Sequence, residues 1–272
     1  MDKMDALQKL ISTFPSAIVA FSGGVDSTFL AVLVYRILGE HSLAVTAVSP
    51  TYPEAQLTEA RELAARYGFP HQVIHTDEFA DPEYINNPPE RCYFCKRSLF
   101  RELRKIADEK GFAVLLDGAN FDDLADFRPG HRAASEMKVR KPLQEVGLTK
   151  AEIRELSKQM GLPTWKKPAY ACLASRIPYG RTITAEALAR IDQAESFLIS
   201  LGFQEIRVRD HFPVARLEIG QADLEQAWQL RHQIASKLHE LGFPYVSIDL
   251  DGFRSGSMNA VLPEELTTMK QG

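Results

Sequence analysis

A short stretch near the start of the chain, Ser-Gly-Gly-Val-Asp-Ser, has the composition of a phosphate-binding turn. Gly23 and Gly24 carry no side chain, so backbone N–H groups can approach an anion closely. Ser22 and Ser27 add hydroxyl donors, and Asp26 or Ser27 is predicted to cap the helix that follows. The start of that helix adds unpaired N–H groups and the positive end of its dipole. These residues predict a site for nucleotide phosphates.

The residues on either side of this turn predict a strand before it and a helix after it. Residues 17–21 form an apolar run typical of a buried parallel strand, and residues 28–38 have an apolar helical face. The motif lacks Gly-Lys-Ser/Thr, which predicts that no lysine reaches the terminal phosphates. It resembles the loop of the pyrophosphatase-loop ATPases, and this resemblance implies cleavage of ATP between its α- and β-phosphates. An ordinary glycine-rich turn is the alternative.

Strands and helices alternate through the N-terminal half, and residues 76–91 between them are polar and proline-rich, which predicts a loop. The predicted strands cover residues 17–21, 43–48, 71–75 and 113–116, and the predicted helices cover 3–13, 28–38, 54–67, 96–110 and 149–160. This rhythm predicts an α/β fold with a doubly wound parallel sheet. Ligands of such sheets bind at the carboxyl ends of the strands.

Polar residues follow two of these strands. Ser49 ends the second strand and is a candidate for the adenosine pocket. Asn120 and Asp123 follow the fourth strand, where acidic and amide oxygens near a triphosphate can hold Mg²⁺ directly or through water. A solvated turn stabilised by its own Asp and Asn side chains is the alternative.

The C-terminal part has the pattern of a smaller α+β domain. Helices are predicted over 184–201 and 222–241, and strands over 205–209, 214–219 and 245–250. We therefore expect an ATP-binding domain over 1–165, a linker carrying Cys172 over 166–183, and a substrate or oligomerisation domain over 184–272.

Two arginines of the C-terminal part alternate along a predicted strand. Arg207 and Arg209 point to one face of it while Val208 points to the other. Two guanidinium groups on one face suit a phosphate. A solvated sheet face is the alternative.

The three cysteines are too few, and odd in number, for a disulfide scaffold, which favours reduced thiols in the cytoplasm. Cys92 and Cys95 stand at the start of a predicted helix, where both thiols can face one metal or cluster. A redox pair is also compatible with this spacing. Cys172 is either a third ligand or a small buried apolar residue. A zinc site could be completed by His71 or His75.

Composition excludes several classes of protein. The 272 residues are 45% hydrophobic and 25% charged, as in ordinary globular proteins, and carry a formal net charge of −4. This charge weighs against broad binding of nucleic acid. No apolar run approaches the ~20 residues of a membrane span, and the first residues lack the apolar segment of a signal peptide.

Several stretches together resemble one family, the ATP-dependent sulfur transferases of nickel-pincer nucleotide cofactor synthesis, called LarE. The resemblance spans residues of about 15 to 260. Its most specific part is Ala-Cys-Leu-Ala-Ser-Arg-Ile-Pro-Tyr-Gly around Cys172. The matching stretches are residues 22–27, 118–123, 127–130, 167–180 and 254–259.

The resemblance implies a substrate and a reaction. A carboxylate of pyridinium-3,5-biscarboxylate mononucleotide would attack ATP, giving an acyl-adenylate and pyrophosphate, and sulfur would then displace AMP. It also favours a substrate-phosphate role for Arg207 and Arg209, with Arg176, Arg254 and Ser257 as companions. The resemblance also makes Glu195 an acidic position where a metal can pass, whereas as a bare sequence feature it is a helix-surface glutamate. Tyr93 and Trp165 are candidates to stack on substrate or adenine, with packing near the domain junction as the alternative, which is favoured for Trp165.

The sequence departs from single-cysteine members of that family, in which the residue matching Cys172 gives up its own sulfur. Members with three cysteines at these places resemble 4Fe–4S proteins, so Cys92, Cys95 and Cys172 are expected to hold a cluster that delivers sulfide. Sulfide itself or a cysteine desulfurase is the expected sulfur source. A homo-oligomer is expected as well.

Three other functions remain open at this point. A tRNA thiolase uses a similar ATP loop, although the acidic charge and the lack of a basic aromatic face argue against it. An amide-forming ligase of the NAD-synthase kind would have no use for the thiols. A non-catalytic nucleotide sensor with a redox-sensitive cluster is the third.

Overall fold

A computed structural model describes residues 2–124, 129–168, 172–254 and 256–263. These residues form two compact units. One comprises residues up to 84 and from 90 to 168, and the other comprises residues 85–89 and the described residues from 172 onward. No helix in the described ranges is long and apolar enough to cross a membrane.

The first unit contains a four-stranded parallel sheet in the order β3-β2-β1-β4. Ile18 of β1 lies between Leu43 of β2 and Leu115 of β4. The predicted α/β fold with a parallel sheet is thereby confirmed. The strands are β1 (Ala17–Ala20), β2 (Ser42–Val48), β3 (His71–His75) and β4 (Val114–Leu116).

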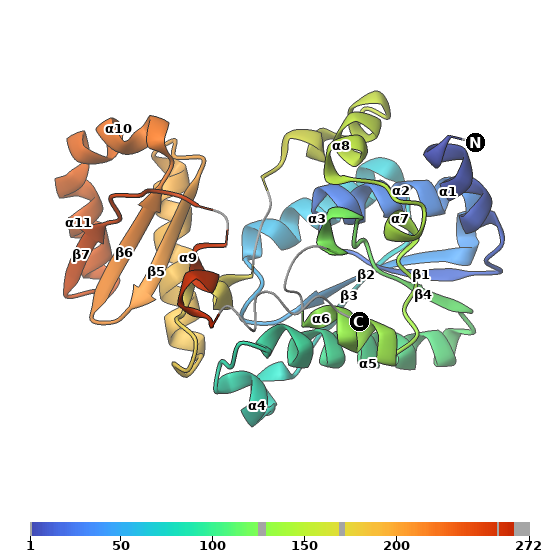
Figure 1. Cartoon of the computed structure of the whole chain (residues 1–272), viewed down its shortest axis with the longest axis horizontal. Helices are drawn as coiled ribbons and strands as arrows, with labels where there is room; N and C mark the ends of the chain where they lie inside the picture. Colours follow the sequence, from blue (N-terminus) through green and yellow to red (C-terminus); the bar gives the residue numbers. More distant parts are fainter. Residues whose placement is uncertain (1, 125–128, 169–171, 255, 264–272) are drawn as a thin grey trace. The chain divides into compact units, whose positions relative to one another are not determined.

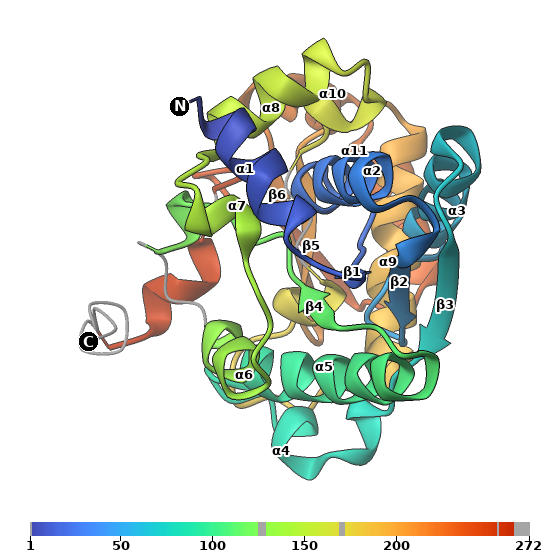
Figure 2. The same cartoon turned by 90° about the vertical axis from the view of Figure 1, so that its right-hand side faces the viewer.

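Helices cover both faces of this sheet, because alternate strand residues face opposite ways (Figures 1 and 2). Val19 packs with the helices of one face, whereas Ile18 packs with Phe100 and Ala133 on the other. On the Val19 face lie α1 (Lys3–Ser12), α2 (Val25–Leu38), α3 (Glu54–Tyr67), α7 (Pro142–Glu145) and α8 (Lys150–Gln159), and on the Ile18 face lie α5 (Arg91–Lys110) and α6 (Gly130–Glu136).

The sheet order places a switch of connection direction between β1 and β4, since β2 and β3 extend the sheet to one side and β4 to the other. Ligands of open α/β sheets bind at such a switch, beyond the carboxyl ends of the strands. The segments after β1 and β4 are therefore the segments to examine for a nucleotide site.

Two predictions for the first unit were wrong in detail. The predicted loop 76–91 contains the 3₁₀ turn η2 (Glu78–Ala80) and the short helix α4 (Pro82–Ile85). The next helix begins at Arg91 rather than at Lys96, so both of its cysteines lie inside it. A helix turn of three or four residues is set by its packing, here Tyr84 buried at 1% exposure, and has too short a period to be recognised in sequence.

The second unit has a three-stranded sheet in the order β5-β6-β7, with β5 and β6 antiparallel and β6 and β7 parallel. Val208 and Leu217 pack with the helices in one core. The helix predicted over 222–241 is interrupted at Leu230. The elements are α9 (Ala185–Ser200), β5 (Ile206–His211), β6 (Val214–Ile219), α10 (Leu224–Gln229), α11 (Arg231–Glu240), β7 (Tyr245–Ile248) and the 3₁₀ turns η5 (Leu173–Arg176) and η7 (Ser257–Val261).

Candidate functional sites

The glycine turn follows β1 directly and leads into α2. Gly23 has φ +68°, a left-handed conformation that favours glycine, and a Cβ there would lie 3.4 Å from the Cβ of Ala60. Gly24 is the N-cap, with no side-chain cap, and the helix begins at Val25. The prediction that Asp26 or Ser27 caps the helix was therefore wrong. Because no side chain bonds the first N–H groups as a cap, they are available to an anion.

The two serines of the turn lie against each other. Ser22 Oγ and Ser27 Oγ are 3.0 Å apart, and the backbone N–H of Ser22 donates to Ser27 Oγ at 3.2 Å. Tyr52, in the segment after β2, donates its hydroxyl to the carbonyl of Ser22 at 2.8 Å. Burial, reinforced by the charge of Glu59, raises the pKa of Tyr52, which keeps this hydroxyl protonated. The ends of β1 and β2 are thus tied together.

Ser49, the candidate for the adenosine pocket, stabilises its own turn. Its Oγ lies 2.8 Å from the Oγ1 of Thr51 and accepts the backbone N–H of Thr51 at 3.2 Å. Its contribution is therefore to shape the turn that carries Tyr52 to the glycine loop.

The carboxylate of Asp26 lies at the start of α2 with one oxygen engaged and one not. Lys150 Nζ lies 2.6 Å from Oδ2, and Asn120 Nδ2 donates to the same oxygen at 3.4 Å. Oδ1 is buried, and no donor among the described residues bonds it. Burial raises the pKa of Asp26, Lys150 opposes this effect, and the charge of Asp123 adds to it. A buried acceptor without a donor is expected to have a cation or a ligand as its partner.

The segment after β4 lies against the start of α2, beside Asp26. A Cβ on Gly118 would lie 3.1 Å from the backbone N of Ser27, so any larger residue would push the two segments apart by a few tenths of an ångström. The backbone N–H of Asn120 donates to Asp123 Oδ2 at 3.0 Å. Asp123 is buried at 6% exposure, so it is not solvated, although the turn is stabilised by its own Asp and Asn side chains as the alternative supposed, and the Mg²⁺ role of this segment stays a prediction. Oxygens from the ends of β1 and β4, above all Asp26 Oδ1, are the donor set that Mg²⁺ prefers.

Two lysines lie beside the loop, although the motif predicted none. Lys150 contacts Asp26, and Lys167 Nζ donates to the carbonyl of Gly23 at 3.0 Å and to Glu59 Oε2 at 2.5 Å. They come from positions more than 120 residues beyond the loop, so no local motif could include them. The capping box of Thr149, which starts α8 at Lys150, was an available signal for the position of the first lysine.

The paired cysteines lie in the first turns of α5, one helical turn apart. Cys92 is exposed, Cys95 is partly exposed, and neither is in a disulfide. Next to them, Lys96 Nζ lies 2.6 Å from Asp117 Oδ2, just beyond β4. Burial lowers the pKa of Lys96, but Asp117 and, more weakly, thiolates at the two cysteines outweigh burial and raise it. This lysine therefore stays charged beside the thiols.

The cysteine cluster itself stays a prediction. Cys92 and Cys95 belong to the first unit and Cys172 to the second. Among the residues that the structure describes, no group of three His, Cys, Asp or Glu is arranged to hold a metal ion. His71, considered as a zinc ligand, instead lies 2.8 Å from Thr46 Oγ1 and packs edge-on against Phe21.

The aromatic candidates of the first unit are held by cations. Tyr93 donates its hydroxyl to Glu136 at 2.7 Å, and the guanidinium of Arg132 lies 3.9 Å from its ring centre. Lys158 and Lys166 lie near the ring of Trp165 at 5.1 and 4.8 Å. The predicted stretch 127–130 begins with residues outside the described part, but Gly130 is described. A Cβ there would lie 2.9 Å from Lys96 Cγ.

In the second unit, the two alternating arginines of β5 share a face, and this face is buried rather than solvated. Arg209 is 1% exposed; it donates to Glu218 Oε2 at 2.8 Å, Ser257 Oγ at 2.6 Å and the carbonyl of Ser175 at 2.6 Å. Arg207 is 9% exposed and donates to the carbonyl of Arg254. The alternative of a solvated sheet face was therefore wrong.

Arg207 differs from Arg209 in having no carboxylate partner among the described residues. Burial, together with the charges of Arg209 and Arg176, lowers its pKa to about 10. Its guanidinium stacks 4.4 Å above the ring centre of Phe253. An arginine that is buried among other arginines without a carboxylate favours a bound anion.

Arg176 and Glu195 form a buried pair that anchors the cysteine-bearing segment. Arg176 donates to both oxygens of Glu195, at 2.8 and 2.9 Å, and lies 3.5 Å from the carbonyl of Cys172. Glu195 Oε1 also accepts the backbone N–H of Val208 at 2.9 Å. Glu195 is therefore a buried partner, and its interpretation as a helix-surface glutamate was wrong.

The remaining candidates of the second unit separate into two groups. Ser257 joins the buried arginine face, where its hydroxyl donates to Glu218 at 3.0 Å. The guanidinium of Arg254 lies outside it, 2.9 Å from Asp251, with its side chain 55% exposed. Ser255, between them, is outside the described residues.

The fold and the loop define the class of protein. The family model of NAD synthase matches residues 3–83, which contain β1 to β3 and the glycine turn. Together with the parallel sheet and its phosphate loop, this match identifies an enzyme of the pyrophosphatase-loop ATPase class.

Relatives that match almost the whole chain are more specific. The chain is 41% identical over 262 residues to an uncharacterized protein of Synechocystis, covering 96% of this chain and 98% of that one. It is 38% identical over 245 residues to the pyridinium-3,5-bisthiocarboxylic acid mononucleotide synthase of Lactiplantibacillus plantarum, covering 90% and 89%. The chain belongs to the family of this synthase, LarE. A tRNA-specific 2-thiouridylase of Azorhizobium caulinodans is 31% identical over 58% of this chain and 51% of its own length.

Proposed function

We propose that this enzyme uses ATP to convert the carboxylates of pyridinium-3,5-biscarboxylate mononucleotide into thiocarboxylates. The observation that carries the proposal is the identity of 38% over 90% of the chain with a synthase named for the bisthiocarboxylic product. The phosphate loop supplies the ATP-binding part of this reaction, and the two units supply the charged groups that it needs.

ATP is held by the turn after β1. Free N–H groups at the start of α2 bind the phosphates that leave as pyrophosphate, and Lys150 and Lys167 offset their charge. Asp26 and Asp123 would hold Mg²⁺, because Asp26 Oδ1 is buried without a donor and both side chains belong to the same charged group. When bound, Mg²⁺ would neutralise the negative charge on the phosphate oxygens in the transition state.

The mononucleotide phosphate is assigned to the buried arginine face. Arg207 is the primary contact, because its charge is not balanced by a carboxylate among the described residues. Arg209 and Ser257 orient the face through Glu218, and Arg176 positions the segment of Cys172 through Glu195. Arg254 faces Asp251 and is a weaker candidate.

Sulfur delivery is assigned to the three cysteines. Cys92 and Cys95 present two thiols on one face of α5, which fits two of the three ligands that a 4Fe–4S cluster needs, and Cys172 would be the third. When bound, the cluster would supply sulfide to the activated carboxyl group without consuming a cysteine. Sacrificial donation by Cys172 is the competing mechanism.

The test is turnover by anaerobically reconstituted enzyme with the biscarboxylate mononucleotide and MgATP. AMP, pyrophosphate and the thiocarboxylate product are expected in amounts exceeding the enzyme, with iron lost in Cys92→Ala and Cys172→Ala. A single turnover with loss of about one H₂S from Cys172 in the intact mass would replace the cluster mechanism by the sacrificial one. AMP formation that requires tRNA instead of the mononucleotide would overturn the proposal.

A further inference from the structure

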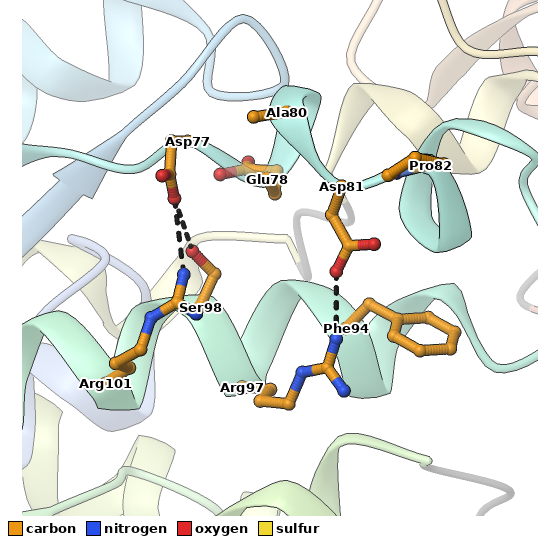
Figure 3. A pocket seen from close by; sticks show the side chains of 9 residues that line it. All are labelled: Asp77, Glu78, Ala80, Asp81, Pro82, Phe94, Arg97, Ser98 and Arg101. Carbon is orange, nitrogen blue, oxygen red and sulfur yellow. Dashed lines mark hydrogen bonds and ion pairs between the residues drawn. The ribbon is translucent and has the colours of Figure 1, made fainter.

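A pocket of the first unit lies outside the proposed nucleotide site. It occupies about 270 Å³ between η2 (Glu78–Ala80) and the face of α5 that carries Phe94, Arg97 and Arg101. Figure 3 shows the acidic side chains along η2 opposite the arginines of the helix. The volume is below the ~300–1,000 Å³ of pockets for drug-sized ligands, so any ligand of this pocket is small.

Glu78 is the unusual member of this pocket. It is 3% exposed, its Oε2 is buried, and no described residue donates a hydrogen bond or an ion pair to its carboxyl group. A buried carboxylate without a partner is costly, and native structures seldom retain one unless a ligand or a proton compensates it. The carboxyl group is therefore a candidate partner for a cationic ligand.

The other charges of the pocket show which ligand group fits. Arg97 is engaged by Asp81 at 2.9 Å. Arg101 is held loosely, 3.5 Å from Asp77, and both side chains are more than half exposed. The carboxylates of Asp77, Glu78 and Asp81 thus face the guanidinium groups of Arg97 and Arg101, which leaves one negative charge unbalanced. Because Asp77 holds Arg101 only loosely, Arg101 can pair with a ligand instead.

We propose that this pocket binds a small α-amino acid. Its ammonium group would pair with Glu78 and its carboxylate with Arg101, while Phe94 and Pro82 give an apolar wall for a short side chain. The net negative charge disfavours a phosphorylated ligand. The proposal does not depend on sulfur transfer.

The test is isothermal titration of the full chain with L-alanine, L-serine and L-cysteine. Ethylamine and propionate, which carry only the ammonium or only the carboxylate, serve as ligand controls. We expect the amino acids to bind at least tenfold more tightly than either control. Glu78→Gln and Arg101→Gln should each weaken binding at least tenfold, whereas Glu83→Gln, on the exposed side of the same segment, should change it less than twofold.

Two results would overturn the proposal. One is that none of the amino acids binds; a higher melting temperature of Glu78→Gln would then identify Glu78 as a strained side chain without a ligand. The other is amino-acid binding that Glu78→Gln leaves intact. Both readouts are independent of ATP and of the mononucleotide, so the proposed function can fail without affecting them.

Discussion

The two units carry positive charge in different ways. The loop of the first unit uses backbone N–H groups and partly buried lysines, Lys150 and Lys167, on flexible stems. The second unit uses arginines buried in a sheet face, Arg207 and Arg209. Lysine is a mobile point charge and arginine a rigid fork, so the first arrangement can follow phosphates that move during a reaction, whereas the second holds one that does not.

The largest expected effect comes from Asp26, the carboxylate beside Lys150 in the proposed ATP site. Asp26→Asn removes the charge of a carboxylate whose buried Oδ1 has no donor among the described residues, and Asn supplies no carboxylate for Mg²⁺. Pyrophosphate release should fall about 100-fold or more. Asp108→Asn, on an exposed position of α5, is the matched control and should leave the rate unchanged. Equal rates for both variants would remove Asp26 from the site.

The next effect separates the two buried arginines. Arg209→Met should cost about 3 kcal/mol in the free energy of unfolding, because it removes a charged partner from Glu218, which is fully buried. Arg207→Met should cost little stability, since it breaks no ion pair and relieves repulsion from Arg209. It should instead raise KM for the mononucleotide about tenfold or more. Denaturant unfolding and steady-state kinetics measure the two effects.

The opposite result would contradict the assignment of the substrate phosphate to Arg207. If Arg207→Met unfolds the protein and leaves KM unchanged, the buried face is structural and the substrate phosphate binds elsewhere.

The smallest effect concerns pH. Lys150 opposes the rise in the pKa of Asp26 that burial causes, so Lys150→Gln should raise that pKa further. If Asp26 works as a carboxylate, the acid limb of kcat/KM then moves to higher pH, and activity is lost on acidification earlier than in the native enzyme. Lys158→Gln, on the same helix, should leave the limb in place. A shift of the limb to lower pH would contradict this electrostatic coupling.

The contrast between the two sites also explains what sequence could predict. The turn at Gly23 and Gly24 is local, so strand, glycines and helix could be recognised together. Lys150 and Lys167 reach the loop from far along the chain, and only the fold brings them there. The strand period correctly placed Arg207 and Arg209 on one face, but burial of that face depends on residues such as Ser257, which come from another element.

Glu195 is a second side chain whose environment could not be predicted from the sequence. In sequence it is one charged residue on a helix, yet in the structure it binds Arg176 and the backbone of β5. Short elements were missed for a related reason. The turn at Glu78 and the helix at Pro82 are too short for a periodic pattern, and Asp81 between them is bonded by Arg97 of α5.

The anchoring of the segment around Cys172 has a practical consequence. The backbone carbonyl of Cys172 accepts from Ser175 and Arg176, while the exposed thiol makes no hydrogen bond with the part of the chain that the structure describes. A chain that lost this sulfur should therefore keep its shape and the affinity for the mononucleotide that we propose. Such a spent molecule would sequester substrate, and the same property makes Cys172→Ser a suitable trap for capturing the bound mononucleotide in crystals.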